Sequence, residues 1–189
     1  MIADMQKWTP NIASIIEHAN QFHPNTEVVS RMVSGNIHKT NYSEVCTRSR
    51  KLASALEKDG YKEGDVIATL ALNTYRHLEM YYGISGMGGI NHTLNFRLHP
   101  EQAVYIINHA EDKVIFCETP FIPILEGLQE NLECVEKYII LCDTSEMPDT
   151  KLKNAISYEE YIKDGDENYE WPALADDAAC ALCYTSGKT

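Results

Sequence analysis

The sequence predicts an α/β fold with a doubly wound, mainly parallel sheet, preceded by a helix, a β-hairpin and a second helix. From Gly64 onward, short apolar runs alternate with segments of helical periodicity, and strands separated by helices are typical of a parallel sheet covered on both faces. The chain has 189 residues, 44% of them hydrophobic, which is enough for one core. We expect residues 1–63 to form an amino-terminal packing segment and residues 64–189 an α/β subdomain.

The first segment is predicted to contain a helix and a hairpin. Apolar side chains recur at helical spacing from Ile12 to Ala19, and this helix is expected to end near Pro24. A hairpin follows, with strands over 27–33 and 37–40 around the turn at 34–36.

The second helix is predicted to begin at a capping box formed by Asn41 and Glu44 and to end near Gly60. Its apolar residues recur on one face, so the other face is expected to be a solvated surface. That polar face carries Arg48, Arg50, Lys51 and Lys58.

The rest of the chain alternates between strands and helices. Strands are expected near 66–72, 90–94, 113–118, 137–142 and 178–184, and helices near 75–87, 100–110, 121–131 and 157–163. Four glycines are interpreted as packing residues that allow a close approach: Gly83, Gly86, Gly88 and Gly89. The acidic stretch 143–177 is interpreted as a surface excursion.

Composition excludes several classes of function. The formal net charge of -12 and the lack of a basic stripe argue against a nucleic-acid partner. No apolar run approaches the roughly 20 residues of a membrane span, and we expect a cytoplasmic protein without a transmembrane segment. The six cysteines lack the paired spacing of a metal site, so we expect no metal ligands among them and small buried thiols, including Cys180 and Cys183.

The chain ends in a hydroxyl-rich run after an apolar strand, and this run is the main candidate for a binding site. Thr, Ser and Gly offer backbone N–H groups and hydroxyls to an anion such as a nucleotide phosphate. The Walker loop does not fit, because it requires glycine where this chain has Leu182. A phosphate loop normally leads into a helix, and none follows here, so we expect the chain to be an amino-terminal fragment.

The loop and a long central segment resemble one family. Tyr184, Thr185, Ser186, Gly187 and Thr189 match the phosphate loop of adenylate-forming (AMP-binding) enzymes, while Lys188 stands where that family has a small hydroxyl residue. The segments 64–68 and 73–102 are similar to fatty-acyl-CoA synthetases of the same superfamily.

The resemblance implies an ATP-dependent fatty-acid–CoA ligase, which uses Mg²⁺ with ATP and takes coenzyme A as its second substrate. It assigns Thr185, Ser186, Gly187, Lys188 and Thr189 to the ATP phosphates and places the catalytic groups beyond residue 189. Lys188 either pairs with phosphate charge or obstructs the loop. Two alternatives stay open: a ligase for an aryl or amino acid, and a non-catalytic nucleotide-binding module.

Residues near the expected ligand edge of the sheet are interpreted as structural. His92 is expected to be a hydrogen-bonded core imidazole, Asn95 to satisfy a turn, and Arg97 to pair with Glu101 or nearby carbonyls. Core packing is the interpretation for Met80, Tyr81 and Tyr82.

In the family, the first helix and hairpin pack largely with later segments. We therefore expect them to expose an apolar surface here and to cause self-association. The residues involved are Ile12, Ile15, Ile16, Val28, Val29 and Val33.

Overall fold

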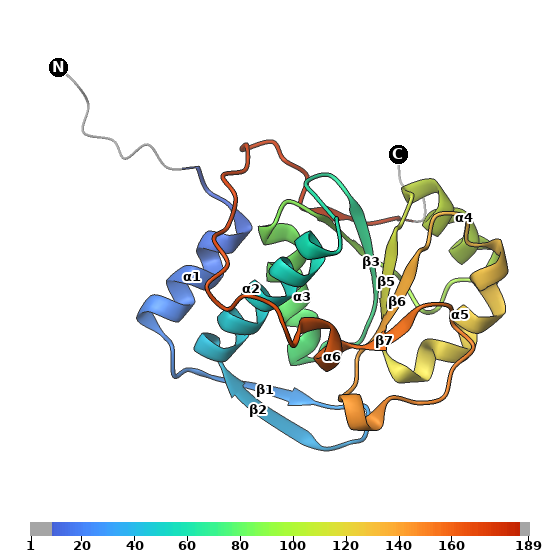
Figure 1. The fold of residues 1–189 in the computed structure, drawn as a ribbon, viewed down its shortest axis with the longest axis horizontal. Helices are drawn as coiled ribbons and strands as arrows, with labels where there is room; N and C mark the ends of the chain where they lie inside the picture. The colour runs from blue at the N-terminus through green and yellow to red at the C-terminus, as the bar shows by residue number, and fades with distance from the viewer. Residues whose placement is uncertain (1–8, 186–189) are drawn as a thin grey trace.

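The fold was described from a computed structural model of residues 9–185, and it confirms the predicted α/β class (Figure 1). The elements run α1 (Ile12–Phe22), β1 (Glu27–Arg31), β2 (Ile37–Asn41), α2 (Tyr42–Lys58), β3 (Val66–Leu70), α3 (Tyr75–Gly86), β4 (Ile90–Thr93), α4 (Pro100–Ala110), β5 (Val114–Cys117), α5 (Ile122–Leu128), β6 (Lys137–Ile140), β7 (Ala155–Ser157), α6 (Tyr158–Ile162) and β8 (Ala181–Leu182). Short 3₁₀ turns occupy Thr119–Phe121, Gln129–Asn131 and Thr144–Glu146.

Six parallel strands form the main sheet in the order β7-β6-β5-β3-β4-β8. The chain enters this sheet in the middle at β3, continues to β4 on one side, and crosses to β5, β6 and β7 on the other side. It then returns to add β8 beside β4 at the first edge. Because the connections after β3 and β5 diverge, the carboxyl ends of these two neighbouring strands form the switch point of the sheet.

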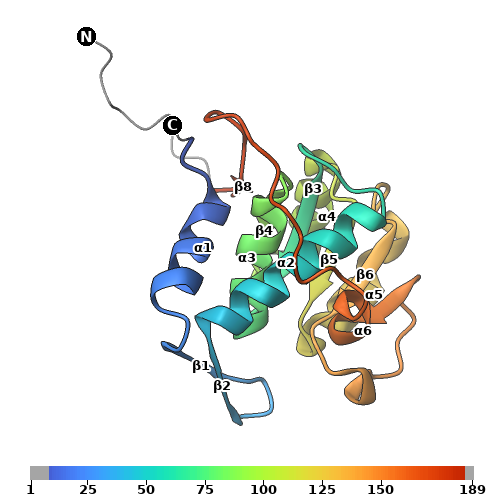
Figure 2. The same cartoon turned by 60° about the vertical axis from the view of Figure 1, so that its left-hand side comes forward.

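Each face of the sheet carries its own core, as the alternation of side chains along a strand requires. Ile67, Phe116 and Ile139 pack with α2, α3 and α6 on one face. Ala68 and Ile115, among others, pack with α4 and α5 on the other. Figures 1 and 2 show these two helical layers on opposite sides of the strands.

Side-chain caps fix the first two helices. Asn11 caps α1 by accepting from Ser14 N–H at 2.8 Å, and Asn41 caps α2 by accepting from Glu44 N–H at 2.9 Å. The Glu44 carboxylate accepts from the Thr40 hydroxyl at 2.7 Å instead of closing a reciprocal capping box. The antiparallel hairpin β1–β2 leads directly into α2.

The interpretation of the four glycines as packing residues is confirmed, since a Cβ on each would meet a neighbouring segment. A Cβ on Gly83 would lie 2.8 Å from Leu52 on α2, and one on Gly86 would lie 2.6 Å from the ring of Trp171. Gly83 and Gly86 thus let α3 touch both α2 and the segment that leads to β8.

The interpretation of 143–177 as a surface excursion was wrong in its central part. This stretch contains β7, an edge strand of the main sheet, and α6, whose Tyr158 and Ile162 are buried in the core. The helix predicted near 157–163 is α6, so its position was predicted although its burial was not, whereas β7 has only three residues and is too short to show a pattern.

Three element boundaries also moved. The last strand covers only 181–182 rather than 178–184, the expected helix over 121–131 is α5 flanked by two 3₁₀ turns, and the first hairpin strand ends at Arg31. In the part of the chain that the structure describes, no helix is long and apolar enough to cross a membrane.

Candidate functional site

A groove of about 710 Å³ lies beside the end of β8 and contains the one described residue of the predicted phosphate loop, Thr185. The remaining predicted loop residues, Ser186, Gly187, Lys188 and Thr189, lie outside the described residues. The groove is lined by Thr93, Asn95, Leu98, Glu101, Gln102, Tyr105, Ile106, Tyr184 and Thr185. The last strand therefore brings Thr185, the first residue of the predicted loop, to a concave surface at an edge of the sheet.

The wall opposite Thr185 is built by the loop after β4 and by α4. Asn95 shapes this loop, since its Oδ1 accepts from Arg97 N–H at 3.0 Å, as predicted. Pro100 occupies the first turn of α4, and Gln102 reaches back to the His99 N–H at 3.3 Å. Residues four apart on one helical face then line the groove: Glu101 with Tyr105, and Gln102 with Ile106.

Tyr184 anchors the chain immediately before the predicted loop. Its hydroxyl lies 2.6 Å from Nδ1 of His109 in the last turn of α4, and its ring centroid is 5.2 Å from that of His92. The chain thus enters the loop from a fixed point between α4 and β4.

His92 is a hydrogen-bonded core imidazole, as predicted. Its Nδ1 lies 2.8 Å from Oδ2 of Asp112, and both side chains are fully buried. Burial raises the pKa of Asp112, and the hydrogen bond with His92 partly offsets this effect. His92 packs against the ring of Tyr184, and neither His92 nor Asp112 lines the groove.

The groove offers hydroxyls and one carboxylate to a ligand. Thr93, Tyr105 and Thr185 supply hydroxyls, and Glu101 supplies the carboxylate. Mg²⁺ prefers several oxygen ligands in octahedral geometry, so one carboxylate does not make a protein-built magnesium site. A magnesium ion that enters with a nucleotide fits this chemistry, because phosphate oxygens then supply the other ligands.

Several predictions about single side chains were wrong. Cys180 and Cys183 are exposed rather than buried, because β8 is too short to carry them into the core. The Arg97 guanidinium lies 5.4 Å from the Phe96 ring centroid, and residues 9–185 contain no ion pair between Arg97 and Glu101. Met80 is fully buried, whereas Tyr81 is 41% exposed and is not a core residue.

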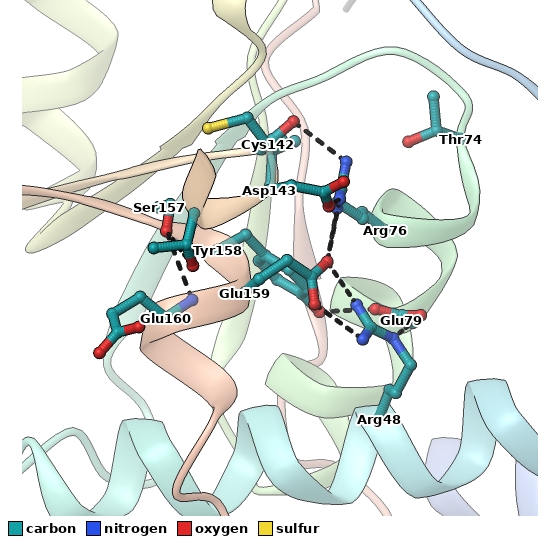
Figure 3. A network of polar contacts seen from close by, with 12 residues as sticks. Arg48, Thr74, Arg76, Glu79, Cys142, Asp143, Ser157, Tyr158, Glu159 and Glu160 are labelled. Atoms are coloured by element: carbon teal, nitrogen blue, oxygen red, sulfur yellow. Dashed lines mark hydrogen bonds and ion pairs between the residues drawn. The ribbon is translucent and has the colours of Figure 1, made fainter. Parts of the chain in front are cut away.

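The sequence did not reveal a buried network of charged side chains between α2, α3 and α6 (Figure 3). Arg48 donates from Nε to Glu79 at 2.7 Å and makes two hydrogen bonds of 2.9 Å to Glu159. Tyr158 donates to the other oxygen of Glu79 at 2.8 Å. Arg76 joins the same Glu159 at 2.9 Å. We call Arg48, Arg76, Glu79, Tyr158 and Glu159 the buried network.

The buried network corrects the interpretation of the polar face of α2. Arg48 is largely buried there, and Arg50 pairs with Glu17 on α1 at 2.6 Å. A signal was present in the sequence, since Arg48 stands one turn before Leu52 and Glu79 one turn before Gly83, on helix faces that turn inward. Their partners come from distant segments, and periodicity alone does not identify them.

Burial and hydrogen bonding shift the pKa values of the two acids of the buried network, Glu79 and Glu159, in opposite directions. Burial raises the pKa of Glu79 to about 7, although Arg48 and Tyr158 donate to its carboxylate. Burial also acts to raise the pKa of Glu159, but the hydrogen bonds from Arg48 outweigh it and the net shift is downward. The network holds α2, α3 and α6 together and has no contact with the groove.

Comparison with known proteins connects this geometry to one family. The family model described as "AMP-binding enzyme" matches residues 16–189. The chain is 42% identical to a medium-chain-fatty-acid–CoA ligase of Ectopseudomonas oleovorans and 40% identical to a 3-methylmercaptopropionyl-CoA ligase of Ruegeria lacuscaerulensis. In both cases all of this chain and 35% of the relative are covered, so the chain spans about a third of the length of these relatives.

Similarity extends to solved structures. The crystal structure of an anthranilate CoA ligase, AuaEII, in complex with anthranoyl-AMP aligns with a TM-score of 0.84 at 21% identity, covering 100% of this chain and 35% of that one. At this identity the alignment shows a shared fold.

Proposed function

Because the chain belongs to the family of AMP-binding enzymes, we propose that the protein containing it is an ATP-dependent fatty-acid–CoA ligase. Such an enzyme joins a carboxylate to AMP, releases pyrophosphate, and then transfers the acyl group to coenzyme A. The observation that carries the proposal is the similarity over the whole chain to relatives named as CoA ligases of carboxylic acids. The cytoplasmic location predicted from the sequence stays a prediction.

The chemistry explains why a phosphate loop is needed. A carboxylate is a poor acyl donor, and AMP becomes a good leaving group for the later thiol attack. Adenylation requires the negative charge that develops on the departing pyrophosphate to be stabilised by fixed donors. Magnesium bound to ATP supplies further charge neutralisation.

In this proposal, residues 185–189 bind the ATP phosphates. Thr185 lines the groove, which leaves room for a ligand beside it. Ser186 and Thr189 would add hydroxyls, and Gly187 would let a phosphate approach the backbone closely. Tyr184, held by His109, would fix the direction from which the loop begins.

Lys188 has two possible effects. Its ammonium group would pair with a phosphate oxygen or would crowd the loop. Substitution Lys188→Ser restores the small hydroxyl residue expected at this position. If the lysine pairs with phosphate, the KM for ATP rises in the variant; if it obstructs the loop, the KM falls.

The proposed activity is tested by mass spectrometry of the products formed by the full-length protein. The reaction contains ATP, Mg²⁺ and CoA with saturated acids of 4 to 16 carbons, and the control lacks CoA. We expect acyl-CoA in the complete reaction and acyl-AMP without CoA. Formation of neither product with any acid contradicts the proposal.

A second acid class is favoured by one specific observation. The relative named as a 3-methylmercaptopropionyl-CoA ligase is nearly as similar to this chain as the relative named for medium-chain acids. We therefore include 3-methylmercaptopropionate, benzoate and anthranilate in the same panel. A kcat/KM at least tenfold higher for one of these acids than for every saturated acid would assign the protein to that class.

The 189-residue chain alone is expected to be inactive, because positioning and charge stabilisation need groups that the family places beyond residue 189. The same product assay on purified residues 1–189 should show no acyl-AMP or acyl-CoA above the rate without protein. Turnover by this chain would mean that its own residues complete the site.

A further inference from the structure

A second cavity, of about 440 Å³, lies at the carboxyl ends of β5 and β6 and has no assigned role. It is lined by Met32, Val33, Ser34, Arg76, Glu118, Thr119, Leu141, Cys142, Glu146 and Pro148. None of these residues lines the groove beside β8. The end of β4 also lines the groove, and β3 lies between β4 and β5, so the two sites are at least two strand spacings apart, roughly 10 Å.

The cavity lies beside the switch point of the sheet, on the side of β5. Glu118 follows β5 directly, and Thr74 follows β3 at the start of α3. Ligands of open α/β sheets bind where the connections of neighbouring strands diverge, as they do after β3 and β5. The hairpin residues 32–34 form a wall across this opening.

Glu118 is a buried acid with little compensation. It is 2% exposed, and in the described part of the chain its one side-chain hydrogen-bond donor is the Thr74 hydroxyl, at a long 3.4 Å. Burial raises its pKa to about 7, and the charge of Arg76 together with the Thr74 hydroxyl and the Leu72 backbone only partly offsets that effect. These donors are few for a buried carboxyl, which can accept a further hydrogen bond from a ligand in the cavity.

Arg76 lines the same cavity, but its guanidinium group donates its hydrogen bonds to groups other than Glu118. It donates to Glu159 at 2.9 Å, to Asp143 at 2.5 Å and to the Leu141 carbonyl at 3.3 Å (Figure 3). No ion pair joins Arg76 to Glu118 within residues 9–185. The positive charge of Arg76 is therefore balanced by two other carboxylates.

The remaining walls divide into an acidic and an apolar part. Glu146 adds a second carboxylate at the exposed side of the cavity, while Met32, Val33 and Pro148 supply apolar surface. We propose that this cavity binds a small organic cation, a primary ammonium group carrying a short alkyl chain. The ammonium group donates to Glu118 near Glu146, and the alkyl chain packs against Met32 and Val33.

The proposal does not depend on the ligase activity and is tested on the 189-residue chain by ¹H–¹⁵N NMR. The probe is n-butylammonium chloride, and the controls are sodium butyrate and 1-butanol, which have similar size but different charge. We expect saturable shifts of the amides of residues 32–34 and 118–119 with the cation alone. Equal shifts with butyrate, or no saturation with butylammonium, overturn the proposal.

Two substitutions then separate the acidic and apolar contributions. Glu118→Gln keeps the shape of the side chain and is expected to raise the Kd for butylammonium at least tenfold. Val33→Ser lies on the exposed hairpin, where it does not disturb the core, and is expected to raise this Kd about threefold. Glu101→Gln, in the other groove, is the matched control and should bind as the unsubstituted chain does. Unchanged affinity in both Glu118→Gln and Val33→Ser contradicts the proposal.

Discussion

The edge of the molecule at β8 and the interior between α2, α3 and α6 are stabilised in contrasting ways. At the edge, a strand of two residues pairs with β4, and Tyr184 is held by a single side-chain hydrogen bond. In the interior, five side chains of the buried network hold one another through several charged hydrogen bonds. The strongest polar interactions therefore lie in the interior of the fold, and fewer interactions hold the edge at β8, where the candidate site lies.

The largest expected effect comes from breaking the buried network. Arg48→Met removes the cationic partner of Glu79 and the bidentate partner of Glu159, which leaves the fully buried Glu79 with the Tyr158 hydroxyl as its remaining donor and no paired cation. We expect the free energy of unfolding to fall by about 3 to 5 kcal/mol in urea titrations. Lys39→Met removes the exposed pair with Glu27 and is the matched control, with an expected loss of about 1 kcal/mol or less. Similar losses in both variants would refute the contrast between interior and surface.

A pH-dependent effect is expected at Glu118. Its pKa is raised from the ordinary 4.5 to about 7 in the folded chain, so the folded chain retains a proton that the unfolded chain has lost between these values. The contribution of this proton to the free energy of unfolding is fully present below pH 4.5 and is lost as the pH rises through 7. Relative to Glu118→Gln, we expect the free energy of unfolding to fall by up to roughly 3 kcal/mol over this range.

The measurement is urea unfolding of both proteins at several values from pH 4.5 to 8. Subtracting the Glu118→Gln curve removes the contribution of other groups, including Glu79, whose pKa is shifted in the same direction. If the free energy of unfolding varies with pH in the same way in both proteins, Glu118 has an ordinary pKa in the folded state and the prediction is wrong.

A smaller effect is expected where α3 meets the segment that precedes β8. In Gly86→Ala the new Cβ would lie 2.6 Å from the Trp171 ring, so the ring or α3 must shift. We expect a loss of about 1 to 3 kcal/mol. Gly127→Ala on α5 has no atom within 4 Å of the new Cβ and should instead stabilise by about 0.5 to 1 kcal/mol. If calorimetry shows that both variants change the free energy of unfolding in the same direction, the packing role of Gly86 is contradicted.

The weakest expected effect is self-association through the amino-terminal elements, which stays a prediction. Ile15, Val29 and Val33 are exposed, while Ile16 is buried against α2, so the apolar surface is smaller than the sequence suggested. Light scattering across a dilution series should show a concentration-dependent mass that decreases in Ile15→Glu. A constant monomer mass at all concentrations contradicts this prediction.

Much of the fold followed from the sequence, because strands such as 114–117 and helices such as 100–110 carry strong periodic patterns. The edge strands were predicted less well: β7 was missed and β8 was predicted too long, since they have only three and two residues and depend on pairing with neighbours. The boundary near residue 63 stays a prediction.

The candidate site was predicted in part. A short hydroxyl-rich run indicated the loop, and Thr185 lies in a groove. The other wall of the groove, from Asn95 to Ile106, required the positions of β4 and α4 relative to β8. The cavity at Glu118 was not predicted, because it joins residues from a hairpin, a helix and two strand ends that are distant in the sequence.

The central claim is that residues 185–189 bind the phosphates of ATP in a carboxylate–CoA ligase. The most direct test is the kinetics of pyrophosphate release by the full-length protein and its Thr185→Val and Ser186→Ala variants. Thr150→Val, whose hydroxyl contacts Glu126 far from the groove, is the control. We expect kcat/KM for ATP to fall by about 10² to 10³ in the double variant, as for lost transition-state donors, and to stay within about threefold of the original in the control. An unchanged kcat/KM in the double variant would contradict the assignment of the loop.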